Sequence, residues 1–165
     1  MPDLLWDDVQ DLFDPHLMGS LPDVCVPGTT VEDWQAVFDL VRARGWAWTY
    51  AEGGAAARLP RAAEVLARQE GAKTATLRVS PVPGVLAIFR LFSAGEVGFD
   101  VDPRELQGQR GVDVLCAFLR AIGRRLRKPV LLSPEGDHGN PVPGFDPAVG
   151  RVVLLADPRS GRQPT

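Results

Sequence analysis

Three short segments with strand character follow one another in the middle of the chain, and this succession constrains the fold more than any other feature. Residues 74–79 and 97–101 alternate apolar and polar side chains, and residues 85–92 are almost wholly apolar. The connectors at 80–84 and 93–95 are short and rich in Ser, Pro and Gly, as hairpin turns require. We therefore predict an antiparallel meander in which residues 85–92 form the central strand, covered on both faces.

Two longer helices are predicted from apolar positions that recur at helical spacing. The first begins at a capping box formed by Thr29 and Glu32 and ends at Gly45. The second spans residues 112–127 and ends before Pro129. Its apolar positions follow i, i+3, i+4, i+7 spacing, so this helix is suited to packing on one face of a sheet.

Shorter elements complete the expected fold. Further helical segments are predicted at 3–13, 60–69 and 102–106, an extended segment at 21–28, a loop at 53–57, and strands at 46–50, 130–132, 142–145 and 151–155. Together they predict an α+β protein with an antiparallel sheet of five to seven strands and helices packed mainly on one face. We expect one domain over residues 1–156, in which 1–20 form an acidic helix and connector, and a disordered tail at 157–165.

The composition is typical of a soluble globular protein. The chain has 165 residues, 45% hydrophobic and 24% charged. No segment approaches the run of ~20 apolar residues that a membrane span needs, and the acidic start Met1-Pro2-Asp3 does not match a signal peptide. Cys25 and Cys116 have no metal-ligand or redox spacing, so we expect reduced thiols, with Cys116 buried, in a cytoplasmic protein.

Charge is distributed unevenly along the chain. Residues 1–59 contain ten acids and three bases, a net of −7, whereas residues 60–165 contain eleven acids and fifteen bases, a net of +4. An acidic surface with aromatic side chains suits a basic protein partner, because complementary charge speeds encounter. The residues predicted to bind such a partner are Trp6, Asp7, Asp8, Asp11 and Asp14.

An alternative site lies in the turn-rich segment at 133–141. Glu135, Asp137 and His138 could supply a general base or ligands, which would make the protein a small enzyme or a ligand-binding protein. Asp, Gly, Asn and Pro are equally typical of a surface turn, and the other histidine, His16, lies in the N-terminal connector. We predict no metal site, no catalytic residue and no cofactor.

Three other features have both a structural and a functional interpretation. The bases at 120–128 could contact phosphate, but they also suit a helix C-terminus, and a pI near 5.4 disfavours nucleic acid as a partner. Trp34, Trp46 and Trp48 could form a stacking platform or simply pack in the core. The apolar strand at 85–92 could support self-association, as in a structural or regulatory subunit.

Several stretches together resemble small α+β proteins of high-GC bacteria. They are 21–23 leading through Pro27-Gly28-Thr29-Thr30 to Trp34, Phe99-Asp100-Val101-Asp102, Lys128-Pro129-Val130-Leu131-Leu132 with 134–136, and Gly144-Phe145-Asp146-Pro147. The order of elements and the acidic face are similar to immunity proteins that neutralise polymorphic toxins. That resemblance implies a non-enzymatic inhibitor that binds a protein, here a basic toxin domain, and it transfers no functional residue.

Overall fold

The protein is an α+β structure built on one antiparallel sheet, and the computed structural model describes residues 2–14, 16, 22–68, 74–133 and 143–154. Its strands are β1 (Asp23–Pro27), β2 (Ala47–Glu52), β3 (Ala55–Ala56), β4 (Ala75–Ser80), β5 (Ala87–Arg90), β6 (Glu96–Val101), β7 (Val130–Ser133), β8 (Pro143–Asp146) and β9 (Arg151–Leu154). The described helices are α1 (Trp6–Val9), α3 (Val31–Arg44), α4 (Ala62–Leu66) and α5 (Gly108–Leu126), with 3-10 turns η1 (Gln10–Phe13) and η2 (Pro103–Glu105). None of these helices has the length and apolarity needed to cross a bilayer.

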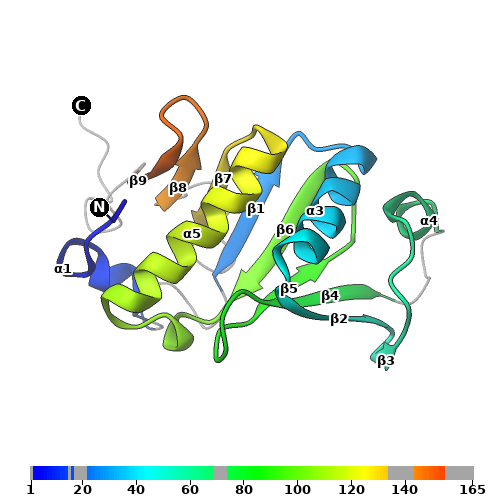
Figure 1. Ribbon diagram of the computed structural model, residues 1–165, viewed down its shortest axis with the longest axis horizontal. Coiled ribbons are helices and arrows are strands. Elements are labelled where there is room, and N and C mark those ends of the chain that lie inside the picture. Colours follow the sequence, from blue (N-terminus) through cyan, green and yellow to red (C-terminus); the bar gives the residue numbers. More distant parts are fainter. Residues whose placement is uncertain (1, 15, 17–21, 69–73, 134–142, 155–165) are drawn as a thin grey trace.

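The strand order is β3-β2-β4-β5-β6-β1-β7-β8-β9, so the predicted meander of β4, β5 and β6 is confirmed. The predicted hairpin of β8 and β9 is also present. β1 lies between β6 and β7 and joins the meander to this hairpin, with Val24 opposite both Phe99 and Leu132. Figure 1 shows β2 and β4 running across the view while β1 and β6 run upward, so the sheet is strongly twisted.

Over the described residues the sheet already has nine strands, and the prediction of five to seven was therefore wrong. β1 was predicted only as an extended segment because prolines flank it, but Pro22 precedes the strand and Pro27 is its last residue. β3 is two residues long and lies in the segment predicted as a loop. Gly53 and Gly54 both have positive φ, which suits the tight hairpin turn between β2 and β3.

β5 is not covered on both faces. Ala87 and Phe89 are buried, but Ile88 and Arg90 on the opposite face remain partly exposed. Arg90 forms an ion pair there with Asp100 of β6, which explains how a charged side chain is accommodated in an otherwise apolar segment. The expectation that residues 85–92 are doubly covered is corrected accordingly, and Phe92 beyond the strand is exposed.

α3 begins one residue later than the predicted capping box. Thr30 is the N-cap, its Oγ1 accepts a hydrogen bond from the Asp33 amide, and Asp33 in turn accepts from the Thr30 amide. Thr29 is instead buried, and its hydroxyl donates to the Ala94 carbonyl at 2.7 Å. A contact with the β5–β6 turn thus removes Thr29 from the cap, while the predicted end at Gly45 is confirmed by its left-handed φ of 69°.

The predicted N-terminal helix and the helix at 60–69 are both shorter than expected. The first is a single turn, α1, followed by η1, which together bury Val9, Leu12 and Phe13. The second is reduced to α4 (Ala62–Leu66). Helices of this length have little intrinsic stability. α1 is held by contacts with α5, and α4 by contacts with α3. The turn at η2 is confirmed.

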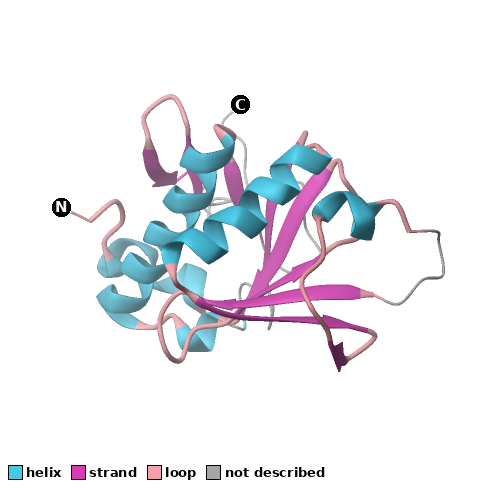
Figure 2. Cartoon of the chain, turned by 45° about the vertical axis from the view of Figure 1, so that its right-hand side comes forward, coloured by secondary structure: helices cyan, strands magenta, loops and turns pink. Residues whose placement is uncertain are grey.

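α5 starts four residues earlier than predicted and packs with α3 on one face of the sheet (Figures 1 and 2). Two of its glycines allow very close approach. A Cβ at Gly111 would lie 2.1 Å from the Leu106 carbonyl carbon, and one at Gly123 would lie 2.0 Å from Cδ1 of Phe145. The buried face of α5 joins Phe89, Phe99 and Phe118 in one continuous hydrophobic cluster.

Gly123→Ala should destabilise the protein by about 1–3 kcal/mol, because the added methyl group would overlap the buried Phe145 ring. The higher helix propensity of Ala favours the substitution by about 1 kcal/mol at most, so the steric overlap with Phe145 dominates the change in stability. Urea denaturation measures the difference. Phe145→Leu in the Gly123→Ala background should couple favourably in a double-mutant cycle, and a Gly123→Ala variant as stable as the wild type would contradict this packing.

Candidate functional site

The N-terminal segment is attached to the beginning of α5 by two glutamine side chains. Gln109 accepts a hydrogen bond from the Trp6 amide at 2.8 Å and donates from Nε2 to the Leu4 carbonyl at 2.9 Å. Gln107 donates from Nε2 to the Phe13 carbonyl at 2.9 Å. These bonds satisfy backbone groups at both ends of the α1–η1 segment and hold it in a fixed orientation.

Asp3 provides a further anchor for the same segment. Its Oδ2 accepts from Arg120 Nη1 at 2.7 Å and from the Val152 amide at 2.8 Å, so it connects the N-terminus to α5 and β9. Burial disfavours the charged carboxylate, but the hydrogen bonds from Val152 and Arg120 and the nearby charge of Arg151 outweigh it. The pKa of Asp3 is therefore lowered.

A groove of about 400 Å³ lies along this attached segment, and we refer to it as the N-terminal groove. Its lining residues are Trp6, Gln10, Asp11, Phe13, Asp14, Arg104 and Gln107. The Trp6 and Phe13 rings lie 5.7 Å apart, with Phe13 buried and Trp6 partly exposed. The partly exposed Trp6 ring, supported by the buried Phe13, is thus accessible beside two carboxylates.

The structure brings together three of the five residues predicted to bind a partner. Trp6, Asp11 and Asp14 line the N-terminal groove, whereas Asp7 and Asp8 are exposed in the first turn of α1. Asp14 Oδ1 accepts a hydrogen bond from the His16 amide at 2.9 Å, which orients the carboxylate.

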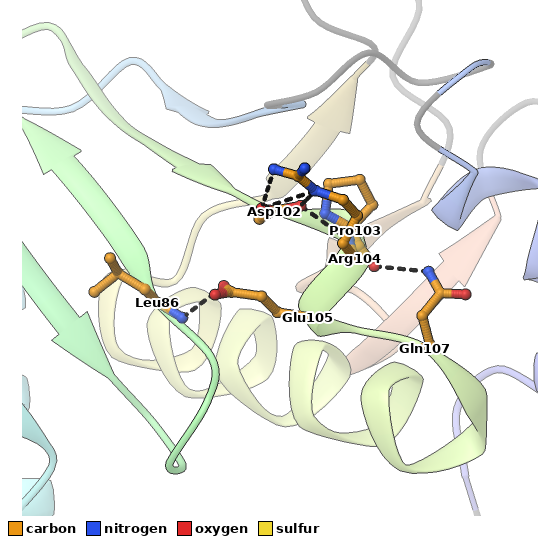
Figure 3. Close-up of polar contacts among 6 residues, drawn as sticks. All are labelled: Leu86, Asp102, Pro103, Arg104, Glu105 and Gln107. Atoms are coloured by element: carbon orange, nitrogen blue, oxygen red, sulfur yellow. Dashed lines mark hydrogen bonds and ion pairs between the residues drawn. The ribbon is translucent and has the colours of Figure 1, made fainter.

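Sequence reasoning missed Arg104 and Gln107, which come from the segment around η2. Figure 3 shows Arg104 turned back onto Asp102: Nε donates to Oδ1 at 3.0 Å and Nη2 to Oδ2 at 2.8 Å. Nearby, Glu105 Oε1 accepts from the Leu86 amide at 3.1 Å and fixes η2 against the start of β5 (Figure 3). The hydrogen bonds from Arg104 lower the pKa of Asp102, so the guanidinium at the groove already has a counterion.

Part of the acidic surplus of the first 59 residues is neutralised within the molecule. Asp3 pairs with Arg120, Asp33 with Lys128 at 3.2 Å, and Glu52 with Arg68. Each of these pairs joins an acid of the first part to a base of the second. The charge difference between residues 1–59 and 60–165 is therefore smaller on the surface than the sequence alone indicates. Asp7 and Asp8 are among the acids that remain exposed.

The bases at 120–128 have mainly structural contacts. Besides Arg120 and Lys128, Arg124 donates from Nη2 to the Gly150 carbonyl at 2.9 Å. These contacts connect α5 to the N-terminus, to α3 and to the β8–β9 turn. They account for much of the cluster that could otherwise have been interpreted as a phosphate site.

The three tryptophans singled out from the sequence do not form one platform. Trp34 is fully buried and donates from Nε1 to the Ser93 carbonyl at 2.9 Å. Trp48 is partly buried with the Arg42 guanidinium 6.0 Å from its ring, and Trp46 contacts Phe118 with ring centroids 5.0 Å apart. Trp46 also lines a cavity, together with Phe118.

The remaining predicted sites are placed as follows. Glu135, Asp137 and His138 lie outside the described residues, as does the predicted tail. β5, the core of the apolar segment considered for self-association, is hydrogen-bonded to β4 on one side and β6 on the other, so its backbone has no free edge. Among the described residues no group of three or more His, Cys, Asp or Glu side chains could hold a metal ion.

Both cysteines are free, and Cys116 is buried as expected. Burial raises the pKa of Cys116 to about 12, with a further contribution from Asp3. Burial also raises the pKa of Cys25 to about 12, assisted by Glu96 and Asp23. Neither thiol therefore has the thiolate character of a nucleophile at neutral pH.

Comparison with known proteins yielded no match to any family model, curated protein or solved structure. The resemblance to immunity proteins accordingly stays a prediction.

Asp3→Asn should reduce the free energy of unfolding by about 1–3 kcal/mol at pH 7, because charge-assisted hydrogen bonds to Arg120 and Val152 are weakened. The folded pKa lies below the ordinary 3.8, so this stabilisation is complete above that value. It is lost as the pH falls through the folded pKa. Denaturant unfolding between pH 7 and pH 2 measures it, with Asp7→Asn as an exposed control; a loss that is the same at every pH would contradict this role.

Proposed function

We propose that this chain is a non-enzymatic protein-binding module that docks a basic protein surface on the N-terminal groove. In the form suggested by its sequence resemblance, it is an immunity-type inhibitor whose partner is a basic toxin domain. The observation that carries the proposal is the combination of the partly exposed Trp6 ring, which packs on the buried Phe13, with Asp11 and Asp14 in one groove. Asp7 and Asp8 extend the negative charge from this groove onto the exposed side of α1.

The two kinds of side chain have different roles in such an interface. A partly exposed aromatic ring supplies apolar contact area at little entropic cost, which is why Trp is enriched among residues that dominate binding energies. The exposed carboxylates act mainly on the rate of encounter, because they attract a cationic surface before contact is made. A partner would therefore present basic side chains around an apolar group that reaches Trp6.

The attachment of the segment to α5 also favours binding. Gln107 and Gln109 fix the backbone on both sides of α1–η1, and Asp3 fixes the preceding residues. A segment that is already ordered loses less conformational entropy when it binds. The bidentate contact between Arg104 and Asp102 limits the positive charge that a basic partner would meet at the edge of the groove.

Replacing Asp7, Asp8, Asp11 and Asp14 together by Asn should slow association with the partner by roughly tenfold or more at low salt, since electrostatic steering changes association rates by 10–10³. The salt dependence of the association rate should largely disappear as well. The partner is first captured from the native cell with the wild-type chain, and association is then followed by biolayer interferometry at several salt concentrations.

A matched pair of double variants separates position from total charge. Asp7→Asn/Asp8→Asn and Glu32→Gln/Glu64→Gln each remove two exposed acids from the first turns of helices. The first pair should slow association and the second should leave it nearly unchanged. Trp6→Ala should mainly accelerate dissociation. Equal effects of the two double variants, or unaltered kinetics in the quadruple variant, would exclude the N-terminal groove as the docking site.

A further inference from the structure

A second cavity, of about 480 Å³, lies where the end of α3, the start of β2 and the β4–β5 turn meet α5. We refer to it as the Trp46 cavity. It shares none of its lining residues with the N-terminal groove. Its volume is within the range of 300–1,000 Å³ that is common for small-molecule sites.

The Trp46 cavity has an aromatic wall. The Trp46 ring lies 5.0 Å from the ring of Phe118, whose burial keeps the pair in a fixed position. Val82 from the β4–β5 turn and Val114 from α5 add apolar surface, and both are partly buried against the core. A flat apolar group can therefore stack on Trp46 without a rearrangement of the core.

Two guanidinium groups also line the Trp46 cavity, beside this apolar surface. Arg44 and Arg110 both line the cavity and are exposed, and Arg44 lies 5.8 Å from the centre of the Trp46 ring. Throughout the described part of the chain, no carboxylate is within ion-pair distance of either side chain. This differs from Arg90, Arg104 and Arg120, each of which has an acidic partner.

The cavity contains one carboxylate among its described lining residues, and that group has another partner. Asp113 accepts a hydrogen bond from Gln109 Nε2 at 2.8 Å, the same amide nitrogen that bonds to the Leu4 carbonyl. Its interaction is thus with the attachment of the N-terminal segment. The formal charge of the lining is +1, from two arginines and one aspartate.

A smaller cavity of about 230 Å³ adjoins the first and shares Val82, Arg110 and Val114 with it. Arg110 therefore stands where the two spaces meet. It is placed to contact an anionic group of a ligand whose apolar part occupies the larger space against Trp46.

We propose that the Trp46 cavity binds a small aromatic carboxylate, with the ring stacked on Trp46 and the carboxylate held by Arg110 and Arg44. Arginine matches a carboxylate through two parallel N–H···O bonds, and it also stacks on aromatic faces. A neutral apolar ligand would leave both guanidinium groups without a counterion. Inorganic phosphate would use the charges but not the apolar wall.

Isothermal titration calorimetry with 1-naphthoate tests this proposal, with the neutral 1-naphthalenemethanol as the matched comparison. The carboxylate should bind at least about tenfold more tightly than the alcohol, as expected for one hydrogen-bonded charge. Arg110→Gln and Arg44→Gln should each weaken naphthoate binding by about tenfold. Arg125→Gln, an exposed arginine of α5 outside the cavity lining, should not change it.

Filling the cavity provides a second, independent test. Ala117 is exposed and lines the cavity, so Ala117→Trp should block naphthoate without disturbing the buried core, as circular dichroism would verify. The Asp7, Asp8, Asp11 and Asp14 quadruple variant should bind naphthoate normally, which separates this site from the proposed docking site. Absence of binding at millimolar naphthoate, equal affinity for the alcohol, or normal binding by Ala117→Trp would each overturn the proposal.

Discussion

The position of α5 determines the geometry of both candidate sites. The absence of a side chain at Gly111 lets the helix backbone lie against Leu106, and the absence of one at Gly123 lets it lie against the Phe145 ring of β8, so α5 packs very closely at both points. Gln107 and Gln109 then fix the N-terminal segment, and Arg110 and Phe118 line the Trp46 cavity. One helix thus connects a proposed protein-docking groove to a proposed ligand cavity through its packing alone.

The charges of the molecule fall into three groups with different physical effects. Pairs such as Asp3–Arg120 and Asp33–Lys128 are partly shielded from solvent and join distant parts of the chain. Asp7 and Asp8 are exposed and add little to stability, because solvent and salt screen them. Arg44 and Arg110, which have no acidic partner among the described residues, belong to a third environment beside aromatic surface, where a bound anion would be better shielded than in water.

Local patterns in the sequence were sufficient to predict the meander, the β8–β9 hairpin and the two long helices, because alternation and helical spacing directly reflect burial. They did not place β1 between β6 and β7, since the pairing of Val24 with Phe99 and Leu132 has no local signal. The cap shifted from Thr29 to Thr30 for a similar reason: the contact of Thr29 with Ala94 is tertiary.

For the two candidate sites, too, the sequence indicated the residues that lie close together along the chain but not those that packing brings together. Trp6, Asp11 and Asp14 lie close together in sequence, and the structure brings them into one groove. Arg104 and Gln107 line that groove from a distant segment, and the Trp46 cavity combines residues of α3, β4–β5 and α5. Such groupings depend on how elements pack, and no spacing of residues along the chain could have indicated them.

Contacts between residues far apart in the sequence have a consequence during synthesis. Asp3 bonds to the Val152 amide across 149 positions, and β1 obtains its second neighbour only when β7 is available. Contacts between such distant residues form late, because a large loop must close first. During synthesis the N-terminal segment could therefore attach to Gln107 and Gln109 once α5 had formed, whereas Asp3 could bond to the Val152 amide only after β9 had emerged. A nascent chain without β9 would lack this anchor of the docking surface.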